Sequence, residues 1–183
     1  MPRLPYPTDT DDYPAETRAA LRHIIESRGG KTPPPSTYMT HAGKAGALLS
    51  DLVEHLRHHT SLSDAETELA ICMSARSTGS DFIWNAHVKL GLAAGTRAEA
   101  IDAVDTGGPL DHLTADEALI ITYGRELLLG PKVSDETYDA VRARWSVKGL
   151  LDMTAVMSVY LMNAAILRAV DHQAPAGARM LTR

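Results

Sequence analysis

Residues 63–87 read SDAETELAICMSARSTGSDFIWNAH, and this stretch decides the fold class. Ser63 precedes Glu66 by three residues, which is a capping box: the hydroxyl accepts from a free backbone N–H and the glutamate bonds back to the cap. Gly79 ends the apolar run that follows, as glycine commonly ends a helix. The stretch therefore predicts an antiparallel hairpin of two helices that are joined at Gly79.

Helix signals continue along the chain, whereas strand signals are scarce. Two more capping boxes, Thr96/Glu99 and Thr114/Glu117, predict further helix starts. The chain has one Phe, and its β-branched residues do not alternate with polar ones as they do in strands. We therefore predict an all-α orthogonal bundle of seven to nine helices. The expected helices cover approximately residues 14–28, 48–60, 63–78, 81–93, 97–105, 115–129, 134–145 and 150–170.

The chain is expected to form a single domain, residues 1–183. Residues 1–37 form an N-terminal arm with the first helix, an arm that could pack on a neighbouring subunit, and residues 38–170 form the core. Three consecutive prolines make residues 31–36, KTPPPS, a stiff loop. The final residues 175–183, PAGARMLTR, are expected to be mobile.

Composition excludes several classes of protein. Eighteen basic and 23 acidic residues give a net charge of −5, and the basic residues are scattered, so we expect no nucleic-acid partner. The single cysteine, Cys72, excludes an intramolecular disulfide and a cysteine-based zinc site. The chain starts without the pattern of a signal peptide, and no apolar run approaches the ~20 residues that cross a bilayer. We therefore expect a cytoplasmic protein without a membrane partner.

Glu68 and His87 are the residues that point to chemistry. Glu68 lies eleven residues before Gly79, about 16 Å along a helix, and His87 lies eight residues after it, about 12 Å. In an antiparallel hairpin the two side chains therefore lie within about one helical turn of each other. A carboxylate that orients an imidazole supports proton transfer near neutral pH. The alternative is a solvated pair or a satisfied core contact, with Trp84 as an ordinary core residue.

The same segment resembles the core motif of the carboxymuconolactone decarboxylase family, which includes the alkylhydroperoxidase D-like proteins. Decarboxylase-like members often carry Thr-Gly-Cys-x-Tyr-x-Trp-x-x-His, and residues 78–87 here read TGSDFIWNAH. The resemblance covers roughly residues 38–170. It implies the helical bundle of that family and a homo-oligomer, trimer or hexamer. The apolar run at residues 150–170, or the N-terminal arm, is expected to lie at the interface.

The chain departs from the peroxidase branch of that family at two positions. In that branch a glutamate is followed twelve residues later by Cys-x-x-Cys-x-x-x-His, but Ser80 and Ile83 occupy the cysteine positions here. A thiol peroxidase needs a thiolate nucleophile and a resolving thiol. Cys72 is expected to be a small buried hydrophobe. An alkylhydroperoxidase-like antioxidant function is therefore a disfavoured alternative.

The resemblance implies acid/base chemistry without a cofactor or a metal. In a decarboxylase of this type, loss of carbon dioxide leaves a dienolate whose charge is stabilised and which is protonated at one carbon. His87 is then the general acid, Glu68 its partner, and Ser80 a hydrogen-bond donor to a small carboxylated lactone or related ring. The residues expected to bind this small-molecule substrate are Trp84 and Phe82 in the pocket wall and the candidate cations Arg57, His58, Arg76 and His41.

Two further interpretations were weighed against this one. His55 and His59 share a helix face with i, i+4 spacing, but no third ligand is placed, and histidines near a helix C-terminus are favoured without metal. The other is a non-catalytic oligomer that binds a ligand in a degenerate pocket. The exposure of His87 distinguishes the enzyme from the ligand-binding oligomer. A ring sealed in apolar packing favours the ligand-binding oligomer, and a ring that faces a cleft with Glu68 favours the enzyme.

Overall fold

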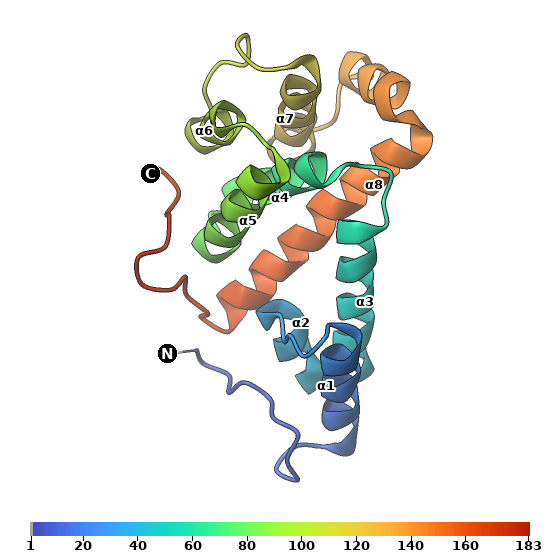
Figure 1. Cartoon of the computed structure of the whole chain (residues 1–183), viewed down its shortest axis with the longest axis vertical. Coiled ribbons are helices and arrows are strands. Elements are labelled where there is room, and N and C mark those ends of the chain that lie inside the picture. Colours follow the sequence, from blue (N-terminus) through green and yellow to red (C-terminus); the bar gives the residue numbers. More distant parts are fainter. Residues whose placement is uncertain (1) are drawn as a thin grey trace. The chain divides into compact units, whose positions relative to one another are not determined.

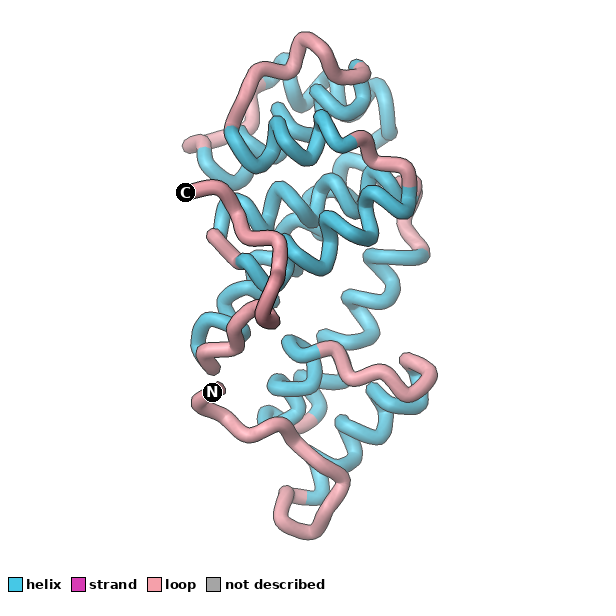
Figure 2. The backbone as a smooth tube through the Cα atoms, turned by 60° about the vertical axis from the view of Figure 1, so that its left-hand side comes forward, coloured by secondary structure: helices cyan, strands magenta, loops and turns pink. Residues whose placement is uncertain are grey.

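The computed structural model describes residues 2–183 and is helical throughout, with no strand in that range (Figures 1 and 2). It has eight α-helices and one 3-10 turn, η1 (Thr40–Ala42). The all-α prediction is confirmed. The helices are α1 (Ala15–Ser27), α2 (Pro34–Met39), α3 (Lys44–His58), α4 (Asp64–Thr78), α5 (Asp81–Ala94), α6 (Ala98–Thr106), α7 (Ala115–Leu129) and α8 (Asp135–Ala169).

The contacts within the chain divide it into two compact units. The first comprises the chain up to His55 together with Met162–Gln173, and the second comprises Leu56–Leu161 together with Ala174–Arg183. The chain therefore passes from one unit to the other within α3 and again within α8. These boundaries cut across the expected division into an arm of residues 1–37 and a core of residues 38–170.

The second unit is built on the α4–α5 hairpin. The Ser63 hydroxyl accepts from the Glu66 N–H at 3.3 Å, and the Glu66 carboxylate accepts from the Ser63 N–H at 2.7 Å, so the capping box forms. Gly79 has a φ of 65°, a left-handed conformation that glycine adopts without the cost of a Cβ, and the chain reverses there. Both α6 and α7 contact α4, and the core includes Leu69 and Trp84. The predicted hairpin is confirmed.

Two local predictions are wrong. Thr96 does not cap α6, because its hydroxyl donates instead to the carbonyl of Ala65 at the start of α4, at 3.0 Å. Arg97 is the residue at the cap. The stiff loop expected over residues 31–36 ends early, since α2 begins at Pro34. Proline suits the first turn of a helix, where its fixed φ is helical and an N–H would have no partner.

The N-terminal arm packs on its own unit. The backbone N–H of Arg3 donates to the carbonyl of Val170 at 2.7 Å, and the Tyr6 hydroxyl donates to the carbonyl of Thr32 at 2.7 Å. The ring of Tyr6 meets that of Tyr38 edge-on, with centroids 5.0 Å apart. The arm therefore has partners within the first unit, and its packing on a neighbouring subunit stays a prediction.

The C-terminal residues, which were expected to be mobile, are held by hydrogen bonds in the second unit. The N–H of Leu181 donates to Asp81 at 2.9 Å, and the N–H and hydroxyl of Thr182 donate to Asp105 at 2.8 and 2.9 Å. The Leu181 side chain is only 6% exposed. The expectation is therefore wrong, because carboxylates on α5 and α6 satisfy the extended backbone of this segment.

The last helix joins two segments that the sequence separates. Ser146 has φ 66° and ψ 177° inside α8, so the helix is kinked between the expected helices of residues 134–145 and 150–170. An 18-residue window of α8 has a mean hydropathy of 1.6, which is sufficient for a membrane span by length and composition. This differs from the expectation that no apolar run approaches the length of a membrane span. Half of that window is buried, and a core helix of a soluble protein passes the same test.

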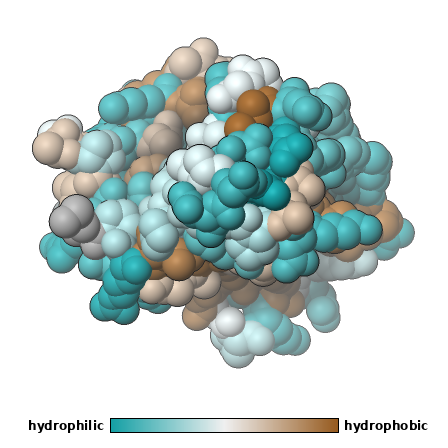
Figure 3. Space-filling view, turned by 90° about the horizontal axis from the view of Figure 1, so that it is seen from below, coloured by the Kyte–Doolittle hydropathy of each residue, from teal (hydrophilic) through white to brown (hydrophobic). Residues whose placement is uncertain are grey.

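Hydrophobic side chains also reach the surface. Figure 3 shows a face on which hydrophilic residues dominate and hydrophobic patches lie among them. Exposed large hydrophobic residues include Leu48 and Leu52 on α3, and Val147 and Leu151 on α8, each pair one helical turn apart. Apolar atoms cover much of any protein surface, so these pairs do not identify a partner.

Candidate active site

The α4–α5 hairpin brings Glu68 and His87 together. The distance between His87 Nδ1 and Glu68 Oε2 is 2.6 Å, and the two side chains are 10% and 7% exposed. A Cβ on Gly91 would lie 3.4 Å from the Cβ of Glu68, so the glycine lets α5 approach α4 closely beside the carboxylate. The predicted hydrogen-bond contact is confirmed.

Two further residues of the second unit complete the surroundings of this pair. Arg57, near the end of α3, donates from Nη2 to Glu68 Oε1 at 2.9 Å, so both carboxylate oxygens are engaged. The ring of Tyr160 on α8 meets the His87 imidazole edge-on, with centroids 4.8 Å apart. Arg57 is among the residues that the sequence proposes, whereas Tyr160 is not. The signal in the sequence is an aromatic residue with a polar tip within the apolar run of residues 150–170.

The surroundings shift the pKa of both members of the pair. Burial raises the pKa of Glu68, but the hydrogen bonds and positive charges of His87 and Arg57 together hold it below its usual 4.5. Burial lowers the pKa of His87 below 6.5, and the opposing effect of Glu68 does not restore it. At neutral pH Glu68 is therefore ionised and His87 is neutral. Because a carboxylate only accepts, Nδ1 carries the proton and Nε2 carries the lone pair.

Trp84, expected in the pocket wall, lies in the core, and the role of Ser80 as a donor to substrate stays a prediction. Trp84 lies one turn before His87 and is completely buried, and its indole N–H has no hydrogen-bond partner among the described residues. Ser80 is the cap residue of α5, where its side chain makes no capping bond. It lies seven residues before His87, about 10 Å along the helix, and so is not within hydrogen-bond reach of the pair.

The remaining predicted substrate-binding residues are dispersed. Arg76 donates from Nη1 to the carbonyl of Thr182 at 2.7 Å. Phe82 is half-buried on α5, and His58 is exposed at the last position of α3. His41 belongs to the first unit. Of the four cations that the sequence proposed, Arg57 is the one that the structure places on the pair.

Cys72 lies on α4 and is fully buried. Burial raises the pKa of its thiol far above the usual range, and the negative charge of Glu68 raises it further. The thiolate that a peroxidase needs is therefore strongly disfavoured at this position.

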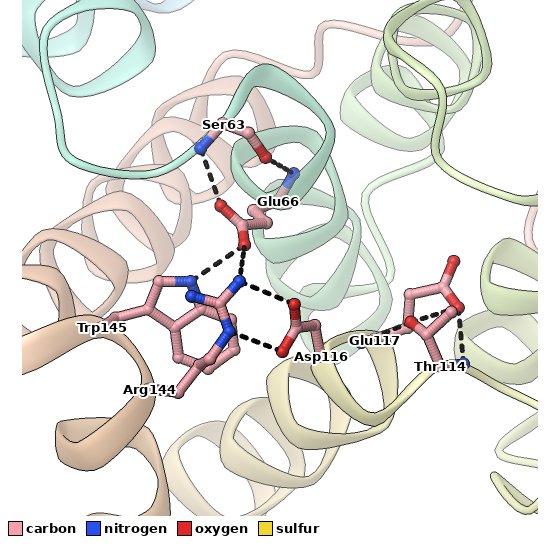
Figure 4. A network of polar contacts seen from close by, with 7 residues as sticks. All are labelled: Ser63, Glu66, Thr114, Asp116, Glu117, Arg144 and Trp145. Atoms are coloured by element: carbon pink, nitrogen blue, oxygen red, sulfur yellow. Dashed lines mark hydrogen bonds and ion pairs between the residues drawn. The ribbon is translucent and has the colours of Figure 1, made fainter.

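A second polar cluster surrounds the start of α4 (Figure 4). Glu66 accepts from the backbone of Ser63 and from the indole N–H of Trp145 at 2.9 Å, and Arg144 makes two 2.8 Å bonds to Asp116. The adjoining cavity, lined in part by Glu66 and Asp116, is about 60 Å³, enough for about two waters. Because these carboxylates are paired, the cluster holds helix ends together and leaves little room for a ligand.

Residues 2–183 contain no group of three or more His, Cys, Asp or Glu side chains placed to hold a metal ion. A scan against protein-family models finds no match, and a search of curated proteins finds no similar sequence. The family resemblance therefore rests on the motif at residues 78–87 and on the spacing of Glu68 and His87.

Proposed function

We propose that this protein is a cofactor-free acid/base catalyst that moves a proton on a small carboxylated ring compound, such as a lactone. The observation that carries the proposal is the 2.6 Å contact between His87 Nδ1 and Glu68 Oε2. The motif at residues 78–87 supports a place in the carboxymuconolactone decarboxylase family, and with it a homo-oligomer.

His87 performs the proton transfer through Nε2. In an isomerisation, neutral Nε2 takes a proton from a carbon next to the substrate carbonyl and leaves an enolate. The imidazolium is stabilised by Glu68, and it returns the proton to a different carbon. The lowered pKa of His87 suits this order of events, because the ring starts as a base.

A decarboxylation uses the same groups in a different order. The substrate carboxylate leaves as carbon dioxide, its bonding electron pair remains on the ring as a dienolate, and the imidazolium of His87 protonates one carbon. His87 must then bind a proton before the reaction. Its lowered pKa makes this charged form the minor one at neutral pH, so decarboxylation is expected to speed up on mild acidification.

One observation favours a second candidate, a non-catalytic ligand-binding oligomer. The His87 side chain is only 10% exposed, and Tyr160 covers one edge of its ring. A pair this buried also occurs as a satisfied core contact. A peroxidase is disfavoured because Cys72 is buried and its thiolate is suppressed.

The test is exchange of substrate hydrogen with solvent. The protein is incubated in D₂O with a panel of small carboxylated lactones, and NMR follows loss of C–H signals and release of carbon dioxide. We expect His87→Gln to lower the rate by about 10²–10⁴-fold. The matched control is His23→Gln, since His23 also contacts a carboxylate, Asp51, at 2.7 Å but is half exposed.

The outcomes separate the alternatives. Cys72→Ser is expected to keep full activity, and peroxides are expected to be inert. Binding of a lactone without exchange or carbon dioxide release would support the ligand-binding protein. Activity that survives in His87→Gln but is lost in Cys72→Ser would overturn the acid/base assignment and favour a thiol mechanism.

A further inference from the structure

The first unit contains a cavity of about 340 Å³ that the proposed chemistry does not use. Its walls come from Met39 and Ala42 around η1 and from Ile166 and Ala169 in the last turns of α8, and Leu4 of the N-terminal arm also lines it. The arm is anchored there, because the N–H of Arg3 donates to the carbonyl of Val170. The volume lies within the range of small-molecule sites, about 300–1,000 Å³, and the walls are mainly apolar as in such sites.

Tyr38 supplies one polar group to this cavity. Its side chain is buried, and its hydroxyl lies 3.1 Å from His172 Nδ1. Burial raises the pKa of Tyr38 and lowers that of His172, so the contact joins a neutral phenol and a neutral imidazole. The phenol oxygen keeps lone pairs that can accept from another donor. The edge-on contact with Tyr6 and the contact with His172 hold the ring in place.

His41 supplies the second polar group. Its Nε2 lies 3.0 Å from the carbonyl of Pro5, and since a carbonyl only accepts, Nε2 carries the proton. In the neutral ring Nδ1 is then an acceptor. The ring of Tyr13 packs edge-on against His41 with centroids 5.6 Å apart, which fixes its orientation. Tyr38 and His41 are the two polar residues of the lining, and these contacts hold both rings in place.

The charge of the walls narrows the ligand class further. In the part of the chain that the structure describes, the lining includes no Lys, Arg, Asp or Glu. An anionic ligand would lose hydration without meeting a cation, which is costly. We propose that this cavity is a second binding site, which takes a neutral, mainly apolar ring compound that carries one hydrogen-bond donor, such as a phenol.

The test compares three probes of one shape: 1-naphthol, its methyl ether 1-methoxynaphthalene, and 1-naphthoate. The full-length protein carries ¹³C-methyl methionine, and the Met39 signal reports on the cavity wall. We expect saturable shifts with 1-naphthol, about 3- to 10-fold weaker binding of the ether because it lacks the donor, and at least about 10-fold weaker binding of the carboxylate.

Variants of the cavity lining test where the probe binds and which side chain accepts its hydrogen bond. Ala169→Phe fills the cavity and is expected to abolish binding, whereas Ala165→Phe, on the same helix but outside the lining, is expected to leave it unchanged. His41→Phe keeps a ring beside Tyr13 and is expected to reduce the preference for 1-naphthol over its ether. The proposal is overturned if neither neutral probe shifts Met39, if 1-naphthoate binds as tightly as 1-naphthol, or if Ala169→Phe still binds.

Discussion

Two histidine–carboxylate pairs of nearly equal length lie in different units of the molecule. His87 and Glu68 are 2.6 Å apart, and His23 and Asp51 are 2.7 Å apart. The side chains of the first pair are 10% and 7% exposed, and those of the second are 46% and 52% exposed. The buried pair also has Arg57 on its free carboxylate oxygen. Hydrogen-bond length therefore does not distinguish the two pairs, whereas burial and the Arg57 guanidinium do.

Burial changes how much each contact contributes to the free energy of unfolding. In water the Coulomb attraction of an exposed pair is weak and screened, and such pairs contribute about 0–1 kcal/mol. Removing the donor of a buried hydrogen bond to a charged group costs about 1.5–3 kcal/mol, because the buried charge loses a contact that had replaced water. The following predictions compare the two pairs on this basis.

The largest difference is expected in stability. His87→Ala removes the N–H that the neutral imidazole donates to the buried carboxylate of Glu68 and leaves Arg57 as the remaining partner, so we expect a loss of about 2–3 kcal/mol. His23→Ala is expected to cost at most about 1 kcal/mol. Urea unfolding measures both. Equal losses would show that burial does not separate the pairs.

The next difference is in turnover. Glu68→Gln keeps the size of the side chain but removes the charge that stabilises the His87 imidazolium, so the rate is expected to fall by about 10²-fold, toward the lower end of the acid/base range. Asp51→Asn is expected to leave the rate unchanged. Rates are measured on whichever lactone the D₂O screen identifies. A Glu68→Gln variant with the wild-type rate would remove Glu68 from the mechanism.

A smaller difference concerns pH. The pKa of His87 is lowered by folding, so the unfolded chain binds a proton near pH 6.5 that the folded protein does not yet accept. Stability is therefore expected to fall as the pH drops from about 7 through 6.5 toward the lower folded pKa. His87→Gln should make this part of the profile shallower and leave the contribution of His172, whose pKa burial also lowers, whereas His23→Gln should keep the wild-type slope. Urea midpoints between about pH 7 and 5 provide the measurement, and a wild-type profile as flat as that of His87→Gln would contradict the assigned shift.

The smallest difference is in salt dependence. A double-mutant cycle of His23→Gln with Asp51→Asn is expected to give a coupling of about 0.2–1 kcal/mol in dilute buffer and less at about 1 M salt, where the Debye length is about 3 Å. The corresponding cycle of His87→Gln with Glu68→Gln is expected to change little with salt, because solvent ions do not enter the buried site. If salt lowered both coupling energies equally, the result would argue against the burial of the His87–Glu68 pair.

Local signals predicted most of the fold. The capping boxes at Ser63 and Thr114 form as expected, because each needs only partners within its own helical turn. The box at Thr96 does not form, although its local sequence is equivalent. A carbonyl from another helix, that of Ala65, competes for the same hydroxyl. A pattern within one turn cannot reveal such a distant acceptor.

In the candidate site, too, the sequence predicted the contact between residues close in the chain but not the contacts between distant segments. Glu68 and His87 belong to one hairpin, so helix geometry alone placed them near each other. The sequence could not show which of the four candidate cations contacts Glu68. The position of Arg57 beside Glu68 depends on where the end of α3 lies in the folded protein. Tyr160 comes from α8, far along the chain, and no spacing rule connects it with His87.

By itself the sequence determined the helical class, the hairpin at Gly79 and the meeting of Glu68 with His87, because these follow from capping, backbone conformation and rise per residue over short distances. Only the tertiary structure decided how deeply that pair is buried, which cation joins it, and that burial lowers the pKa of His87. It also decided that the N-terminal arm lines a cavity in the first unit. Burial and electrostatics depend on packing between segments distant in the chain, and local sequence does not encode which of those segments will meet.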